Sequence, residues 1–456
     1  MTGLQQSIDK MRADEVSDAA IETFCDLYTR WQEGETGLLP ESEIEPLGDP
    51  PSLDELPEPG DEAHAALDAT VVLKLNGGLG TSMGMTKAKS LLEVKDGLTF
   101  LDIIARQVLD ARERLGVRLP LVLMNSFATR NDSLDELAQV PGIGSDVPAD
   151  FVQSKEPKLR EEDATPVEWP DDPGLEWAPP GHGDVYPSLV GSGMLGALLE
   201  HGYRWLFISN SDNLGAVLDP RILAWIAREE IPFLSEVADR TEADRKGGHL
   251  ARRVADGGLV LRESAQVPDE DADAFQDVSR HTYFNTNNLW VDLRALQAVM
   301  RERGGVMGLP MIVNRKTVDP NDGDSTPVIQ LETAMGAAVG VFDGARALRV
   351  PRTRFAPVKT TSDLLVLRSD AYELTGDARL VLAESRSEAP LVVLDDAYYK
   401  RLRDFDERFA AGPPSLVAAD RLKVVGDVRF GAGVVVRGSV TVEGPADLDA
   451  GTVLEG

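Results

Sequence analysis

Residues that build disulfide frameworks, metal clusters and nucleophilic catalytic centres are scarce in this chain of 456 residues, which has one cysteine, Cys25, and five histidines. A single cysteine excludes an internal disulfide framework and a clustered cysteine metal site. No serine–histidine–aspartate arrangement or histidine metal cluster stands out. Lysines, aspartates and amide side chains remain, and these suit phosphate transfer by positioning and charge stabilisation, without a covalent enzyme intermediate.

Long apolar runs are also missing. No stretch approaches the ~20 residues that span a bilayer, and the first residues, MTGLQQSIDKMRADEV, contain no hydrophobic signal-peptide core. The simplest interpretation is a cytoplasmic protein with no membrane partner.

Positive charge is the third shortage, because 46 Lys and Arg residues face 77 Asp and Glu residues, for a formal net charge of −31. This balance argues against broad nucleic-acid binding, which needs a positive surface. A phosphate ligand stays open, provided that a few lysines, backbone amides and a metal ion create a local positive pocket.

The order of patterns predicts several structural parts. An apolar stripe at spacings of three and four predicts helix over residues 1–36, and the proline-rich, acidic stretch 38–63 is typical of an extended connector without regular structure. From about residue 70, short β-rich runs alternate with helical stretches such as 100–114 and 191–203. This alternation predicts an α/β domain with a mixed, mostly parallel sheet, in which ligands bind at the carboxyl ends of the strands.

The tail has a different rhythm. Leu422, Val428, Val434 and Val440 are six residues apart, which is the signature of a small parallel β-helix. Its repeat carries no catalytic residue types, so a structural or assembly role is expected.

The stretch LKLNGGLGTSMGMTKAKSLLEV, residues 73–94, places several glycines between an apolar run and two lysines, Lys87 and Lys89. Glycine lets backbone amides approach a ligand closely, and converging amides form an anion cradle. The spacing matches neither a P-loop nor G-x-G-x-x-G. Taken alone, the stretch is equally compatible with a simple turn.

Polar residues also follow other β-like runs. His182 lies between glycines in APPGHGD (178–184), where a ligand contact competes with a structural role. Asp212 ends the run WLFISNSDNLG (205–215) and is placed either to hold Mg²⁺ or to cap a turn.

Two further motifs extend the pattern. The amides of YFNTNNLWVDL (283–293) suit sugar hydroxyls or a turn, and Glu236, Gly247 and Gly248 could complete such a polar pocket. Lys359 in RTRFAPVKTTSDL (352–364) is either a surface lysine or a charge beside a phosphate.

These motifs, in this order, resemble those of the UTP–glucose-1-phosphate uridylyltransferases (UDP-glucose pyrophosphorylases) of the eukaryotic type. The similarity covers nearly the whole chain and runs through KLNGGLGTSMG, KSLLEVKDGLTFLD, LMNSF, PPGHGD, SNSDNLGA, KGGHL, FNTNNLW, QLETAMGAA and RFAPVKTTSDLL, and through the six-residue rhythm of the tail.

The resemblance implies a fold of three parts: a helical N-terminal region with its connector (1–69), a Rossmann-like nucleotidyltransferase domain (70–365) and a C-terminal domain with a left-handed parallel β-helix (366–456). It also implies reversible, Mg²⁺-dependent synthesis of UDP-glucose and pyrophosphate from UTP and α-D-glucose 1-phosphate. The tail could support a homo-oligomer, although members of the family differ in oligomeric state.

The same resemblance implies roles for individual residues. It assigns catalytic and phosphate-gripping roles to Lys89 and Lys359, and the metal to Asp212. Sugar-phosphate contacts are implied for His182, Asn210, Glu236 and Asn287. Nucleotide contacts are implied for Leu75, Asn76, Gly77, Gly78, Met124, Gln153, Gly181, Asn210, Asp212 and Lys359.

One segment departs from the family pattern. Many relatives carry a lysine two residues after GTSMG, whereas Thr86 stands there in this chain and Lys87 is displaced by one position. Lys89 keeps its register, so only a role for Lys87 is left open. The alternatives are a pyrophosphorylase for galactose 1-phosphate or an N-acetylhexosamine 1-phosphate, and a non-catalytic UDP-sugar-binding protein on the same fold.

Overall fold

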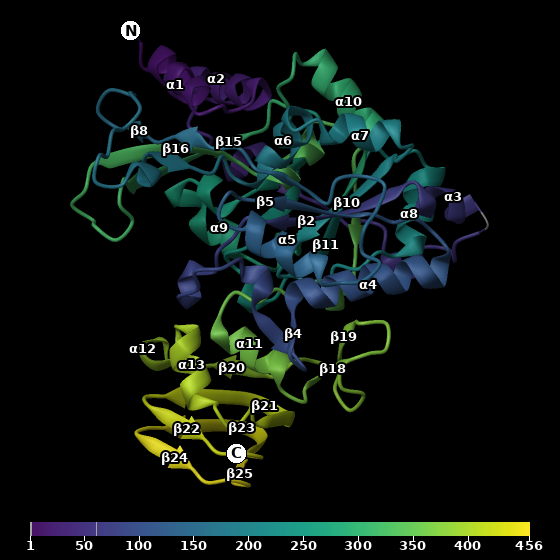
Figure 1. The fold of residues 1–456 in the computed structure, drawn as a ribbon, viewed down its shortest axis with the longest axis vertical. Coiled ribbons are helices and arrows are strands. Elements are labelled where there is room, and N and C mark those ends of the chain that lie inside the picture. Colours follow the sequence, from purple (N-terminus) through teal and green to yellow (C-terminus); the bar gives the residue numbers. More distant parts are fainter. Residues whose placement is uncertain (1, 61) are drawn as a thin grey trace.

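A ten-stranded sheet forms the centre of the computed structural model, which describes residues 2–60 and 62–456 (Figure 1). Seven strands follow the order β1-β12-β14-β10-β2-β5-β6, while β11 and β13 pair with β14 and β12, and β17 pairs with β11. Their bounds are β1 Ile44–Pro46, β2 Thr70–Asn76, β5 Leu121–Asn125, β6 Asp150–Val152, β10 Trp205–Asn210, β11 Phe233–Asp239, β12 His249–Arg253, β13 Leu259–Arg262, β14 Tyr283–Asp292 and β17 Arg346–Arg349.

The sheet is mixed, and the block that runs through β10, β2, β5 and β6 is parallel, as is the pair of β11 with β17. Strand β14 pairs antiparallel with β10 and β11. The expected α/β architecture with a mixed sheet that is parallel through its centre is confirmed. The parallel strands are buried on both faces, which explains why their sequences are nearly continuous apolar runs.

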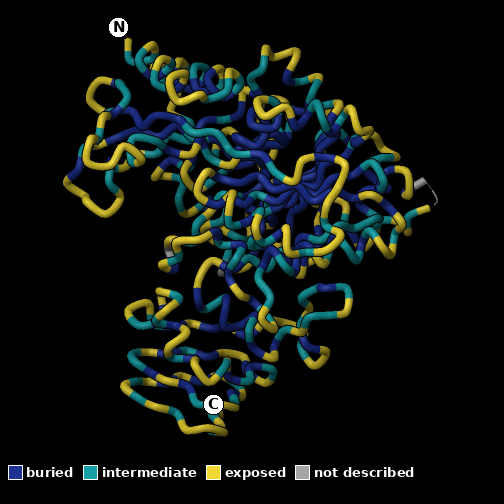
Figure 2. Tube along the Cα trace, viewed as in Figure 1, coloured by how far each residue is buried: buried dark blue, intermediate teal, exposed yellow. Residues whose placement is uncertain are grey.

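Helices cover both faces of the sheet, and the buried chain concentrates along the strands between them (Figure 2). One face packs against α3 Glu62–Asp68, α4 Phe100–Leu115, α5 Arg130–Ala138, α8 Pro220–Arg228 and α11 Thr361–Arg368. The other packs against α6 Val185–Gly191, α7 Met194–Glu200 and α10 Leu293–Glu302. The helix predicted over 100–114 is confirmed as α4. The one predicted over 191–203 is shorter, because Gly193 adopts φ +77° just before α7 begins.

The N-terminal stripe forms two helices, α1 Gly3–Ala13 and α2 Asp18–Gln32, so the prediction of one helix over 1–36 is wrong at the turn between them. Ser17 begins α2, because its side chain accepts a hydrogen bond from the Ala20 amide. Both helices pack on the small sheet of β15 Met311–Thr317, β16 Pro327–Thr333 and β8 Leu159–Arg160.

The acidic connector contains a strand, contrary to the expectation of no regular element. Strand β1 pairs antiparallel with β12, with Ile44 opposite Arg253. Ile44 is buried with Ala251 and Val260, and Leu47 and Leu53 of the same segment are buried as well, so a few apolar residues in an acidic context attach it to the rest of the fold.

The C-terminal part stacks parallel strands at the end of the molecule opposite to α1 and α2 (Figure 1). Leu422 lies opposite Val440, Val428 opposite Ala446, and Val435 opposite Val453. Each pair is 18 residues apart, which is three six-residue repeats. The elements are β20 Leu391–Val393, β21 Ser415–Val425, β22 Val428–Phe430, β23 Val435–Glu443, β24 Ala446–Leu448, β25 Val453–Glu455, α12 Asp396–Tyr399 and α13 Leu402–Arg408.

One hydrophobic core connects this part to the central sheet. It contains Phe100 of α4, Leu364 of α11, Tyr399, Phe405 and Leu422. The remaining short elements are β3 Glu93–Lys95, β4 Leu98–Thr99, β7 Glu156–Pro157, β9 Trp177–Ala178, α9 Ala272–Gln276, β18 Tyr372–Leu374 and β19 Leu380–Leu382. Within residues 2–60 and 62–456, every helix is too short or too polar to cross a membrane.

Candidate active site

Three residues implied for nucleotide binding lie side by side at the carboxyl ends of parallel strands. In the sheet register, Leu75 of β2 is opposite both Asn210 of β10 and Met124 of β5. Gln153 directly follows β6, and its amide donates to the Asn125 carbonyl at 2.7 Å. The fold therefore brings these four residues to one edge of the sheet, where open α/β sheets bind ligands.

Gly77 has no side chain because Gln153 occupies that space. A Cβ on Gly77 would lie 2.5 Å from Gln153 Oε1. Gly78 is exposed, and its carbonyl accepts from the Lys89 amide at 2.9 Å. The loop therefore presents backbone beside the Gln153 amide, a surface suited to a planar base.

Asn76 lies below this surface. It is buried, and its Nδ2 donates to Asn125 Oδ1 at 2.7 Å and to Ser133 Oγ at 2.8 Å. These bonds tie the end of β2 to β5 and α5, so the side chain supports the loop from beneath.

Lys89 and Asp212 form the electrostatic centre of the site. Lys89 Nζ lies 2.6 Å from Asp212 Oδ2, and the two side chains are 18% and 20% exposed. Asp212 Oδ1 is buried and has no hydrogen-bond partner. An unpaired carboxylate oxygen at a buried position is costly unless a cation or donor satisfies it.

Lys359 reaches the same region through its backbone. Pro357 forms a β-bridge with Asn213, and the Val358 amide donates to the Asp212 carbonyl at 3.4 Å. Lys359 follows directly and is exposed, and its charge lowers the pKa of Glu263, which burial raises overall. Lys89 therefore contacts the Asp212 side chain directly, whereas the Lys359 segment is joined to the Asp212 turn through its backbone.

His182 is held in one protonation state. Its Nδ1 lies 2.9 Å from the Met335 amide, which donates to it, so the ring is neutral and carries its proton on Nε2. Reduced solvation of the ring lowers the pKa of His182. Gly181, at φ +79°, approaches the Thr333 backbone so closely that a Cβ would lie 2.5 Å from its carbonyl oxygen.

Asn287 sits at an irregularity of β14. Its φ is +59°, and the β11–β14 register shifts at this level. Asn285 holds the turn, since its Oδ1 accepts from the Asn287 amide at 3.1 Å and its Nδ2 donates to Asn287 Oδ1 at 2.8 Å. Bulges of this kind re-aim side chains at the edge of a site.

The Glu236 side chain lies inside the protein. It is fully buried, and both its oxygens are engaged by the Arg354 guanidinium at 2.7 and 2.6 Å. Trp290 Nε1 and Asn288 Nδ2 donate to it as well, at 2.9 and 3.0 Å. No oxygen is left for a sugar, so the expected direct contact is not available and Glu236 acts as an internal support.

Glu263 lies near the Lys359 segment, and the sequence did not reveal it. A Cβ on Gly248 would lie 2.4 Å from Glu263 Oε2, so the carboxyl group rests on the KGGHL loop, and it feels the Lys359 charge. Its local sequence, RESAQ, has no catalytic pattern. Only the antiparallel pairing of β12 with β13, which places His249 opposite Arg262, brings it there.

Lys87 points elsewhere. It is exposed, and its charge acts on Glu136 of α5, where it opposes the effect of burial on the pKa of that carboxyl group. Lys89, two residues on, is therefore the lysine of this loop that pairs with Asp212.

The residues present fit a magnesium ion that is shared with a ligand. No group of three His, Cys, Asp or Glu side chains within the described residues could hold a metal ion alone. The buried, unpaired Asp212 Oδ1 is a suitable single carboxylate ligand. Mg²⁺ is commonly bound by one or two carboxylates together with substrate phosphates and water.

Known proteins resemble this chain along most of its length. The potato (Solanum tuberosum) UTP–glucose-1-phosphate uridylyltransferase is 42% identical over 408 residues, covering 89% of this chain and 81% of that protein. The barley (Hordeum vulgare) enzyme of the same name is 40% identical over 465 residues, covering 99% and 95%. A crystal structure of a mutant Leishmania major UDP-glucose pyrophosphorylase in complex with UDP-glucose superposes with a TM-score of 0.93 at 46% identity, covering 100% of this chain and 98% of that one.

The fold and the lysine–aspartate site at its strand ends define a nucleotidyltransferase of the Rossmann-like class. The family model described as UTP–glucose-1-phosphate uridylyltransferase matches residues 21–437. The chain belongs to this family.

Proposed function

We propose that this protein joins UTP and α-D-glucose 1-phosphate into UDP-glucose and pyrophosphate, reversibly and with Mg²⁺. The observation that carries the proposal is the Lys89–Asp212 pair with its unpaired carboxylate oxygen, set beside a glycine loop at the carboxyl ends of parallel strands. Family membership and the UDP-glucose complexes of relatives support the choice of substrates.

The reaction is a direct in-line displacement. A phosphate oxygen of glucose 1-phosphate attacks the α-phosphorus of UTP and forms the new P–O bond. The bond from the α-phosphorus to the bridging oxygen breaks, and pyrophosphate leaves with the electron pair. The attacking oxygen is ionised at neutral pH, so no general base is needed, and the unprotonated nitrogen of His182 already accepts from the Met335 amide.

The barrier is the approach of two anions, and the chain's cations reduce it. Lys89 and Lys359 stabilise charge on the phosphates as the α-phosphorus is attacked. Asp212 Oδ1 holds the metal, which supplies Lewis-acid stabilisation of the phosphate oxygens when it is bound.

The proposed ligand contacts follow the placement of the residues. Asn210 lies between the nucleotide and the sugar. The uridine is contacted by residues of the glycine loop and the neighbouring strand ends, namely Leu75, Gly77, Gly78, Met124, Gln153 and Gly181. The neutral ring of His182 donates a hydrogen bond from Nε2–H to the sugar phosphate. Glu263 and Asn287 receive the glucose hydroxyls.

A pyrophosphate-release assay with UTP, Mg²⁺ and a panel of sugar 1-phosphates tests the proposal. Glucose 1-phosphate is expected to give the highest kcat/KM. A preference for galactose 1-phosphate or N-acetylhexosamine 1-phosphate would identify a sister pyrophosphorylase. A protein that binds UDP-glucose but releases no pyrophosphate with any sugar 1-phosphate would be a non-catalytic binding protein.

We also propose that the stacked C-terminal strands form a left-handed parallel β-helix, and that the chain divides at 69/70 and 365/366. The 18-residue spacing between paired strands supports a coil of three six-residue sides.

A further inference from the structure

Lys74 is a lysine in the middle of a buried strand. It lies on β2 and is 2% exposed. Because side chains alternate along a strand, Lys74 shares its face with Val72, which packs in the core that contains α4. Removing an ammonium group from water is expensive, so a buried lysine needs strong partners.

The partners of Lys74 are the two ends of the turn that carries Asn210 and Asp212. Its Nζ donates to Ser209 Oγ at 2.7 Å and to the Ala216 carbonyl at 2.9 Å. One ammonium group therefore ties residues seven positions apart to the strand beneath them.

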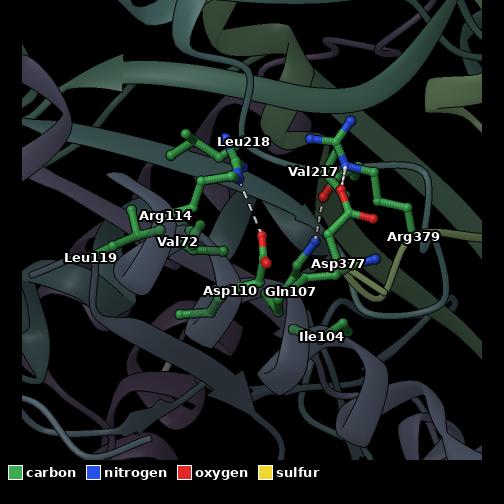
Figure 3. Close-up of a pocket in the computed structure, with 14 residues that line it drawn as sticks. Val72, Ile104, Gln107, Asp110, Arg114, Leu119, Val217, Leu218, Asp377 and Arg379 are labelled. Atoms are coloured by element: carbon green, nitrogen blue, oxygen red, sulfur yellow. Dashed lines mark hydrogen bonds and ion pairs between the residues drawn. The ribbon is translucent and has the colours of Figure 1, made fainter. Parts of the chain in front are cut away.

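No ion pair competes for this ammonium group among the residues that the structure describes. Lys74 lines a cavity of about 30 Å³ beside α4. The charged side chains of this cavity are paired with one another, Arg114 with Asp110 and Arg379 with Asp377 (Figure 3). The hydrogen bonds of Lys74 are thus directed to the turn alone.

A second polar side chain supports the same turn. Gln107 of α4 donates through Nε2 to the Leu214 carbonyl at 3.2 Å and to the Ala378 carbonyl at 3.0 Å. The turn is therefore held from below at its first residue, near its end and at its last residue, while its Asp212 side faces Lys89.

We propose that Lys74 is a positioning residue that clamps both ends of segment 209–216, the end of β10 and the turn after it, and thereby fixes Asn210 and Asp212 at the strand end beside Lys89, an inference that rests on the proposed function of Asp212. Burial lowers the pKa of Lys74 to about 7, while the negative charges of Glu236 and Asp212 oppose this shift.

Lys74→Met tests the clamp, because methionine keeps much of the side-chain volume and removes both hydrogen bonds. Lys95→Met is the matched control, since Lys95 is a half-buried lysine whose Nζ also donates to two carbonyls, those of Arg368 and Ser369, at the far end of α11. Hydrogen–deuterium exchange of the peptide 209–216 without ligands is expected to accelerate in Lys74→Met and to stay at the wild-type rate in Lys95→Met.

Turnover and metal titration give the second readout. In Lys74→Met, kcat is expected to fall and the Mg²⁺ midpoint to rise on the order of 10–100-fold, as for other supports of metal ligands. KM for UTP changes much less, because the glycine loop keeps its own contacts. Ser209→Ala, which leaves Lys74 in place and removes one anchor, is expected to shift exchange and midpoint in the same direction by less.

Each outcome decides the proposal. Wild-type exchange, kcat and Mg²⁺ midpoint in Lys74→Met would overturn the clamp. If Lys74→Met does not fold, Ser209→Ala decides, and unchanged values there overturn it. A wild-type protein that releases no pyrophosphate from any sugar 1-phosphate would refute the proposed function instead, and the exchange experiment would still judge the clamp.

Discussion

At the scale of single residues, the site depends on the different surroundings of the two carboxylate oxygens of Asp212. Asp212 Oδ2 is taken by Lys89, and Oδ1 is buried without a partner. A cation at Oδ1 would satisfy that oxygen while Lys89 keeps the other, so a metal ion and a lysine can share the aspartate without either leaving.

Asp212→Asn should therefore weaken Mg²⁺ binding at the site most directly. The amide keeps the shape but loses the charge, so the Mg²⁺ concentration that gives half-maximal activity is expected to rise on the order of 10–100-fold. Asp256→Asn, on an exposed turn, should leave the titration unchanged. If the activity of Asp212→Asn depends on Mg²⁺ concentration as in the wild type, Asp212 does not bind the metal.

Lys359→Ala tests the second cation. Its removal should lower kcat on the order of 10²–10³-fold and weaken UTP binding far less, because the stabilisation is felt mostly in the transition state. Lys87→Ala is the matched control, since that lysine is exposed and its charge acts on Glu136. If Lys359→Ala turns over at nearly the wild-type rate, Lys359 does not stabilise the transition state as proposed.

Gln153 was indicated only by the family resemblance. Sequence patterns predicted the position of Asp212 directly after a strand, because strand ends in a parallel sheet meet at one edge. They failed for Glu236, whose guanidinium partner Arg354 is 118 residues away. They also missed Glu263, because its approach to Gly248 depends on a hairpin register. Contacts between residues far apart in the chain cannot be predicted from the local sequence around either residue.

At the scale of elements, the N-terminal helices cover buried acids next to the His182 loop. Glu156 of β7 is 2% exposed, and its Oε1 accepts from the Leu331 amide at 3.0 Å. Burial raises the pKa of Glu156 well above its usual range. Burial also raises the pKa of Asp184 to about 6.

Glu156→Gln should stabilise the fold at high pH. In the folded protein the raised pKa favours the protonated carboxyl group, so stability falls as pH rises from the unfolded pKa toward the folded one and stays lower above it. Glutamine keeps the acceptor for Leu331 without ionising. Its melting temperature is expected to exceed that of the wild type at pH 8, with the difference shrinking toward pH 5.

Thermal unfolding across this pH range, with the exposed Glu168→Gln as control, makes the comparison. An equal gain at both pH values would mean that ionisation of Glu156 is not the cause. Sequence gave no warning of this site, since an acid followed by proline reads as surface, and the burial comes from α1, α2 and β16 closing over β7.

At the scale of the whole molecule, the C-terminal coil is periodic. Leu422, Val428, Val434 and Val440 are six residues apart and all buried, and from Arg421 on the paired residues of β21 and β23 are 18 positions apart. The six-residue spacing was legible in the sequence because the coil buries one apolar residue per side.

Insertion of a second copy of residues 422–439 after Ser439 should add one coil in register. The variant is expected to fold with wild-type turnover and a melting temperature within a few degrees, since stacked repeats contact mainly their neighbours. A nine-residue copy, 431–439, breaks the six-residue spacing and should lower the melting temperature. Equal stability of the two insertions would contradict this register.

The buried side chains that run without a break from α4 through α11 to the coil have a consequence for how the molecule fails. Among the described residues, this shared core packs the C-terminal strands and the central sheet against the same side chains, so the two parts are expected to unfold together. Weakening the packing around Tyr399 and Phe405, where the two parts meet, is expected to destabilise both, whereas a change in the last strands acts mainly on their neighbours.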